Sequence, residues 1–83
     1  MFGHGQREMN MRPVEIKPIA LANAIYFDNN YPIGYGAYER TLKNIKDCLA
    51  EGDIFFCEPV DDGYRVSTDT GASWHVKTLG WVK

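Results

Sequence analysis

The spacing of apolar residues along the chain changes once, near Gly52. Before it, over 37–51 (AYERTLKNIKDCLAE), large apolar side chains recur at the spacing of one face of an α-helix, and polar residues occupy the other face. These apolar positions are Tyr38, Leu42, Ile45 and Leu49. Gly52 then supplies the left-handed conformation that ends many helices. The pattern predicts an amphipathic helix over 37–51 with one apolar stripe.

After Gly52 the apolar residues alternate with polar ones, as they do in half-buried strands. The predicted strands are 54–58, 64–68 and 74–78. Asp61-Asp62-Gly63 and Asp69-Thr70-Gly71-Ala72 separate them and have the composition of tight turns. Because short connections make neighbouring strands pair antiparallel, we expect a meander over 54–78.

The segment before the helix is less clearly patterned. Residues 12–17 alternate between apolar and polar side chains, and Pro13 and Pro18 bound the segment. This pattern predicts a strand at the edge of a sheet, where proline is tolerated. Residues 19–27 (IALANAIYF) are apolar nearly all round, so either a helix that begins at Pro18 or a buried strand fits them. The alanines favour the helix. Residues 1–11 predict a flexible N-terminal tail, and Met9 or Met11 are alternative starts.

The composition predicts one soluble α+β domain over 12–83. The chain has 83 residues, 45% of them hydrophobic and 24% charged, which suits one small core. The expected architecture is a small three- or four-stranded antiparallel sheet with the helix 37–51 packed on one face. No apolar run approaches the roughly 20 residues that span a bilayer, and the N-terminus lacks the apolar region of a secretory signal. We therefore expect a cytoplasmic protein that does not enter a membrane.

Charge and metal-ligating residues exclude more functions than they indicate. The net charge of −2 lacks the basic stripe on which nucleic-acid binders depend, so nucleic acid is an unlikely partner. Cys48 and Cys57 do not form a CxxC pair and are expected to be free core thiols. His4 and His75 are far apart in the sequence, whereas a zinc site needs three or four converging ligands. We expect no metal and no cofactor.

The tripeptide Asp69-Thr70-Gly71 resembles the active-site loop of aspartic proteases. That family needs two such carboxylates close enough to share a proton, and it places two apolar residues before the motif. Here Ser67 and Thr68 precede it, and too few residues follow to build a flap and a substrate cleft. The same residues suit a hairpin turn, in which Asp69 accepts hydrogen bonds from backbone amides. We therefore expect a turn, no catalytic residues and no enzyme.

The aromatic residues indicate a binding function. Five Tyr and two Trp are more than a core of this size can bury, and both residue types are enriched in interface hot spots. Tyr31 and Tyr35, in a Pro/Gly-rich loop, and Trp81, near the C-terminus, are the candidate partner-binding residues. The alternative is that these residues cover the edges of the sheet.

The leading hypothesis is a small non-catalytic module that binds a protein and modulates or inhibits it. Short, nearly neutral chains of this style are often encoded by phages or other mobile elements and act on host machinery. The second hypothesis is a single-stranded nucleic-acid binder that stacks bases on Phe55, Tyr64 and Trp74 of an open sheet face. A homodimer formed by pairing of sheet edges is a further expectation.

Overall fold

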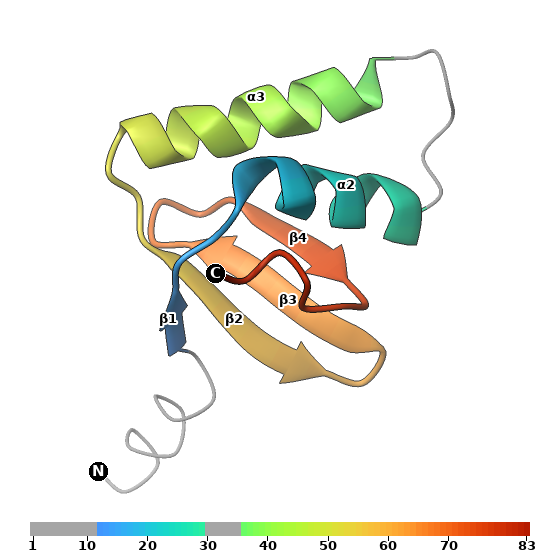
Figure 1. Ribbon diagram of the computed structural model, residues 1–83. Helices are drawn as coiled ribbons and strands as arrows, with labels where there is room; N and C mark the ends of the chain where they lie inside the picture. Colours follow the sequence, from blue (N-terminus) through green and yellow to red (C-terminus); the bar gives the residue numbers. More distant parts are fainter. Residues whose placement is uncertain (1–11, 30–35) are drawn as a thin grey trace, which may run out of the picture.

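The computed structural model describes residues 12–29 and 36–83, and it confirms a small α+β fold (Figure 1). Its elements are β1 (Arg12–Val14), α2 (Pro18–Asp28), α3 (Ala37–Ala50), β2 (Phe55–Val60), β3 (Gly63–Thr68) and β4 (Ser73–Val76). The strands form one antiparallel sheet in the order β1-β2-β3-β4. Strand β1 lies at one edge of the sheet, as expected for the segment bounded by prolines. The meander β2-β3-β4 forms the rest of the sheet.

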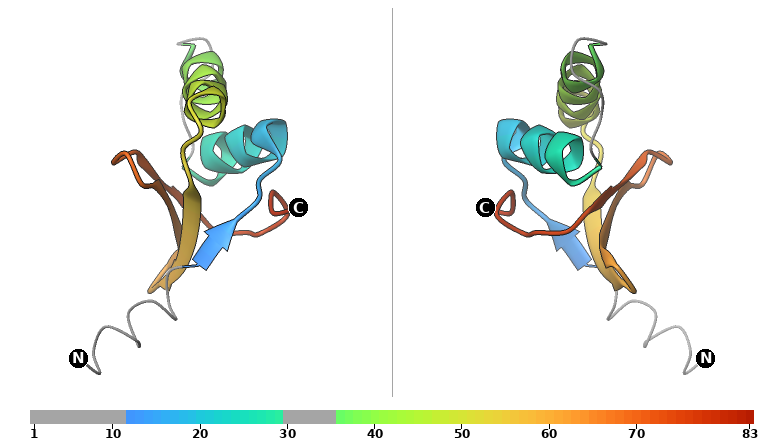
Figure 2. Two further views of the ribbon diagram at one scale, coloured as in Figure 1. Left: turned by 90° about the vertical axis from the view of Figure 1, so that its left-hand side faces the viewer. Right: turned by 90° about the vertical axis from the view of Figure 1, so that its right-hand side faces the viewer.

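Helix α2 settles the ambiguous segment 19–27 as a helix. Pro18 is its first residue, a position that needs no backbone N–H donor. Leu21, Ala22 and Ile25 are fully buried and belong to the core. In Figures 1 and 2, α2 lies between α3 and the C-terminal segment, and both helices lie on the same side of the twisted sheet. Most of the apolar positions of α2 are buried or half-buried, while Ile19 and Phe27 remain exposed.

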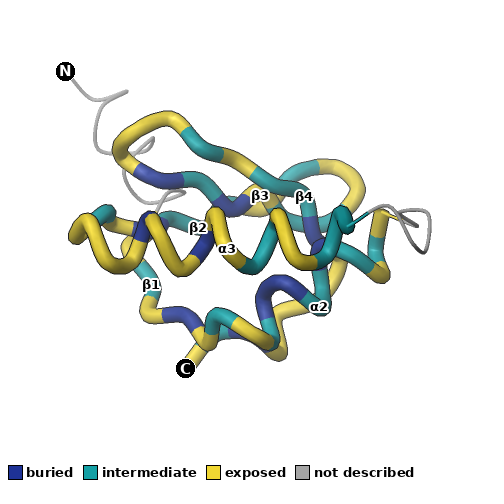
Figure 3. Tube along the Cα trace, turned by 90° about the horizontal axis from the view of Figure 1, so that it is seen from above, coloured by how far each residue is buried: buried dark blue, intermediate teal, exposed yellow. Residues whose placement is uncertain are grey.

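Helix α3 is amphipathic as its periodicity predicted. Ile45 and Cys48 are buried, and Tyr38 and Leu42 pack against the core. Seen along the tube in Figure 3, exposed stretches of α3 alternate with covered ones. The helix packs mainly along α2, where the rings of Tyr26 and Tyr38 meet edge to face at 5.8 Å. Leu49, at the C-terminal end of the same stripe, stays 40% exposed.

The two faces of the sheet differ in burial. Phe55, Val66 and Val76 point towards the helices and are buried, and the ring of Trp74 stacks on Phe55 at 6.1 Å. On the other face, Arg65 donates to Glu58 across the β2–β3 pair at 3.2 Å. In β3 and β4, strand alternation thus places one largely apolar row towards the helices and one polar row away from them, whereas the outer row of β2 contains Phe56 and Val60 beside Glu58.

Turn chemistry explains how the strands are connected. Gly63, which begins β3, has φ +142°, and a Cβ there would lie 2.4 Å from the carbonyl oxygen of Val76. Only glycine therefore fits where β3 begins beside the end of β4. The predicted turn before β3 is confirmed, and its glycine is required for a close approach as well as for its backbone angle.

Trp81 corrects a prediction from the sequence. It was expected to be exposed, but its side chain is 1% exposed and is the largest fully buried side chain among the described residues. Its backbone carbonyl accepts from Lys17 N–H at 2.8 Å, and its indole Nε1–H donates to the Thr78 carbonyl at 2.6 Å. The adjacent residue Val82 forms a bridge with Ile16. The C-terminal segment therefore returns along the chain that joins β1 to α2 and closes the core.

The end of α2 covers the outer edge of β4. Asn29 Nδ2–H donates to the His75 carbonyl at 2.9 Å, and Lys77 N–H donates to Asp28 Oδ2 at 2.7 Å. A neighbouring strand would offer its backbone groups in the same places. Two consecutive side chains thus take the hydrogen bonds that an edge strand otherwise leaves to solvent.

Candidate protein-docking surfaces

The loop that resembles a protease motif is tied into the fold by hydrogen bonds. Ile54 N–H donates to Asp69 Oδ1 at 3.0 Å, and Asp69 N–H donates to the Ile54 carbonyl at 3.1 Å. The carboxylate therefore accepts from a backbone amide as expected, but this amide belongs to the segment before β2 and not to the turn itself. The Thr70 hydroxyl donates to Asp53 Oδ2 at 2.7 Å. That the chain is not an enzyme remains a prediction.

Both cysteines are free thiols, as expected. Cys48 is buried and Cys57 is half-buried. Burial, followed by a hydrogen bond to Asp53 and the negative charges of Asp53, Glu51 and Asp47, raises the pKa of the Cys48 thiol. Burial and the charge of Glu58 raise the pKa of the Cys57 thiol. Within residues 12–29 and 36–83, no group of three or more His, Cys, Asp or Glu side chains is placed to hold a metal ion.

The aromatic residues proposed to stack on nucleic acid do not lie on an open sheet face. Phe55 in β2 is buried, and Trp74 in β4 stacks on it across β3, on the same face of the sheet. Tyr64 also packs against the core. The register explains this arrangement, because Tyr64 and Trp74 pair with Val76 and Val66, which are fully buried. The face that the second hypothesis needs is therefore the one that the helices cover.

The predicted partner-binding residues are not brought together by the described structure. Tyr31 and Tyr35 lie outside the described residues, and Trp81 is buried. Large apolar side chains are nevertheless exposed elsewhere in the described part, which sequence reasoning did not identify. They are Ile19, Phe27, Leu49, Ile54 and Leu79.

Two of these residues form the outer stripe of α2, which we define as Ile19 and Phe27. They are 56% and 68% exposed and lie about two turns apart, with Asn23 between them, on the side of α2 away from the buried residues Leu21 and Ile25. The Phe27 ring is held in an edge-to-face contact with Tyr26 at 5.3 Å. The sequence contained a signal for this stripe. A helix with apolar residues on every side must either be covered completely or expose an apolar face.

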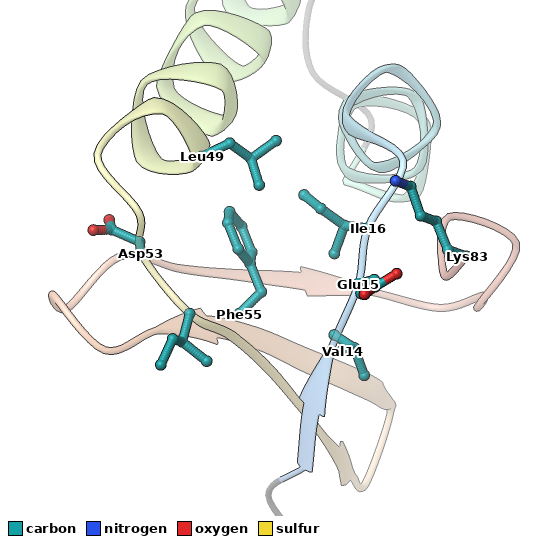
Figure 4. Close-up of a pocket in the computed structure, with 8 residues that line it drawn as sticks. Val14, Glu15, Ile16, Leu49, Asp53, Phe55 and Lys83 are labelled. Atoms are coloured by element: carbon teal, nitrogen blue, oxygen red, sulfur yellow. The ribbon is translucent and has the colours of Figure 1, made fainter.

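Two more of the five, Leu49 and Ile54, line an apolar cleft between α3 and β1, which we call the α3–β1 cleft (Figure 4). Its volume is about 250 Å³. Leu49 from α3 lies over one end of the Phe55 ring, and Ile16, which follows β1, lies beside the ring. Three polar residues complete the lining together with Val14 and Ile54. They are Glu15, Asp53 and Lys83.

The two surfaces arise from different parts of the fold. The α2 stripe belongs to one helix, whereas the α3–β1 cleft combines residues from the start, middle and end of the described chain. No helix among the described residues is both long and apolar enough to cross a membrane. Comparison with known proteins adds nothing to this geometry, because no family model, curated protein or solved structure matches the chain.

Proposed function

We propose that this chain is a small non-catalytic module that binds a protein partner and modulates or inhibits it. The observation that carries the proposal is the outer stripe of α2, where Phe27 is 68% exposed on a well-packed helix. A partner that covers Phe27 and Ile19 removes apolar area from water, which stabilises a complex by about 25 cal/mol per Å² before the costs of association.

The position of the stripe also supports a role for the two loop tyrosines. Phe27 lies one residue before the end of α2, and Tyr31 and Tyr35 follow it closely along the chain. Aromatic side chains combine large apolar area with few rotatable bonds, and tyrosine adds a polar tip. We propose that Phe27, Tyr31 and Tyr35 contact one partner together. Trp81 is not part of this proposal because it is buried.

We extend the proposal to the source of the chain and to the kind of partner it binds. A short, nearly neutral chain with net charge −2 suits a protein encoded by a phage or mobile element that acts on a component of host machinery. Its partner would then be a host protein that recognises an apolar helix surface.

Affinity capture with defined variants tests the proposal. The wild-type chain, immobilised as bait, should retain one partner from a host lysate, identified by mass. The Ile19→Gln/Phe27→Gln variant should lose at least about tenfold of that partner, since truncating a hot spot costs about 2 kcal/mol or more. Leu79→Gln, which changes an exposed apolar residue outside the stripe, should retain it.

A second variant tests the loop separately. Tyr31→Ala/Tyr35→Ala should weaken capture of the same partner without changing the thermal unfolding of the chain. Capture that is equal for wild type and the α2 variant, with both folded by far-UV circular dichroism, would contradict the proposal. Salt-sensitive binding of a labelled single-stranded oligonucleotide by the wild type would instead favour the nucleic-acid alternative.

A further inference from the structure

We propose that the α3–β1 cleft is a second binding site, which takes an extended segment of a partner protein carrying a large apolar side chain followed by lysine or arginine. This site shares no residue with the outer stripe of α2, so either proposal can fail while the other stands. Three features of the cleft support it: its apolar lining, its size and its charge.

The lining of the cleft is ready to receive an apolar group. Leu49 is 40% exposed and Ile54 is 47% exposed, while Phe55 and Ile16 beneath them are buried. In Figure 4 the Leu49 and Ile16 side chains approach the Phe55 ring from two sides. A side chain inserted here would bury the exposed apolar atoms of Leu49 and Ile54, as the anchor residues of interfaces do.

The cleft is large enough for a side chain of a peptide but too small for a drug-sized ligand. Its volume is about 250 Å³, which lies below the range of roughly 300–1,000 Å³ found for drug-sized ligands. One or two side chains of a peptide fill such a space. The rest of the peptide would then lie across the rim, where Glu15, Asp53 and Lys83 are.

The negative charge on the α3 side of the cleft favours a basic residue next to the apolar side chain of the partner. Helix C-termini favour cations by about 0.3–1 kcal/mol, yet the last turn of α3 has no basic residue. Glu51 and Asp53 follow it directly, and Asp53 lines the cleft. Nearby Asp47 is already paired with Lys43 at 2.8 Å. The acidic end of the helix is unfavourable for the fold itself, and a lysine or arginine of the partner would compensate it.

The field of these carboxylates already acts on a neighbouring group. The charges of Asp53, Glu51 and Asp47 add to burial in raising the pKa of the Cys48 thiol. On the opposite wall, the negative charge of Glu15 and the positive charge of Lys83 offset each other, so the net charge of the cleft stays negative. The cleft therefore distinguishes between peptides by the charge beside the apolar anchor, with the basic residue towards α3.

Fluorescein-labelled peptides with blocked ends test the site. The probe is Ser-Leu-Leu-Lys-Arg-Gly-Ser, and two matched peptides replace either Lys-Arg by Glu-Glu or Leu-Leu by Ser-Ser. By fluorescence anisotropy, the probe should bind the full chain with a dissociation constant of about 10 μM to 1 mM, as suits a few anchoring contacts. Each matched peptide should bind at least about tenfold more weakly. In amide NMR spectra the probe should shift the signals of Leu49, Ile54 and Val14.

Variants of the cleft separate its apolar and charged contributions. Leu49→Gln/Ile54→Gln should weaken probe binding at least about tenfold, whereas the exposed Leu79→Gln and the α2 variant Ile19→Gln/Phe27→Gln should leave it unchanged. Glu51→Gln/Asp53→Asn should weaken it about two- to fivefold at low salt, the range of exposed charge pairs, and reduce its salt dependence. Asn keeps an oxygen for the hydrogen bond from Thr70.

Three results would overturn the proposal. The first is equal binding of the Lys-Arg and Glu-Glu peptides, and the second is probe binding that shifts no cleft residue or is not detected at 1 mM peptide. The third is a gain of tenfold or more in probe affinity when residues 1–11 are removed. That gain would identify the chain's own N-terminal segment, which contains Arg7 and Met9, as the occupant of the cleft.

Discussion

Asp69 joins two parts of the chain that are separated by a whole hairpin. Its carboxylate accepts from Ile54 N–H at 3.0 Å, and its own N–H donates to the Ile54 carbonyl at 3.1 Å. The pair holds the turn before β4 against the segment that leads into β2. Asp69 thus fixes the position of the turn after β3 relative to α3, and its carboxylate has a structural role.

Replacing Asp69 tests this structural role. Asp69→Ala removes only the side-chain acceptor and should lower the free energy of unfolding by about 1 kcal/mol, since the bond is exposed to water. Asp69→Asn keeps an oxygen acceptor and should lose less. Urea unfolding followed by circular dichroism measures both. An Asn variant as unstable as the Ala variant would show that the Ile54 hydrogen bond is not the source of the effect.

Turn residues could be predicted from the sequence because each depends on its own local conformation. Gly52 and Gly71 have φ +83° and +108°, which favour glycine as the turn composition suggested. The environment of Trp81 could not be predicted in this way. Whether a tryptophan near the end of the chain is exposed depends on where that segment packs, and its partners Lys17 and Ile16 lie more than sixty residues earlier.

At the scale of elements, α2 and β4 protect one another. Asn29 and Asp28 at the end of the helix occupy the outer edge of the strand through the backbone groups of His75 and Lys77. Asn29 Nδ2–H also donates to the Ile25 carbonyl at 2.8 Å, so it ends the helix as well. An edge strand covered in this way is a poor template for pairing with a second chain.

Removing this cover should expose the β4 edge. Asp28→Ala/Asn29→Ala should lower the free energy of unfolding by about 1–3 kcal/mol, because two hydrogen bonds to the strand and one to the helix are lost. The variant should also self-associate more than the wild type. Sedimentation velocity at several concentrations measures this, with Asp28→Asn as the control that keeps an acceptor for Lys77 N–H. A monomeric, fully stable variant would contradict it.

The periodicity of the sequence was sufficient for α3 and for the meander, since each has one buried and one open face. It was insufficient for 19–27, because a segment with apolar residues at buried and exposed positions alike carries no period to distinguish helix from strand. The α3–β1 cleft could not be predicted at all. Its residues Val14, Leu49 and Lys83 meet only through the packing of elements far apart in the chain.

At the scale of the whole molecule, one segment without regular secondary structure completes the core. A domain of 83 residues buries a smaller share of its surface than larger domains do, so each large buried side chain matters more. Trp81 is the largest of these among the described residues. Through its carbonyl and the bridge from Val82 to Ile16, the C-terminal segment also connects β1 to the rest of the fold.

Trp81→Ala should therefore destabilise the chain more than truncation of any other aromatic residue within 12–29 and 36–83. Removing a buried tryptophan side chain costs about 3–5 kcal/mol, a large fraction of the roughly 5–15 kcal/mol that stabilises a domain. Trp74→Ala is the matched control, since Trp74 is only partly buried, and it should lose less. Trp81→Phe keeps most of the apolar volume but not the 2.6 Å hydrogen bond to Thr78, and should fall between the two. Urea unfolding followed by far-UV circular dichroism measures all three without depending on tryptophan fluorescence. If Trp81→Ala is as stable as Trp74→Ala, the C-terminal segment does not close the core, and Trp81 regains its place among the candidate contact residues.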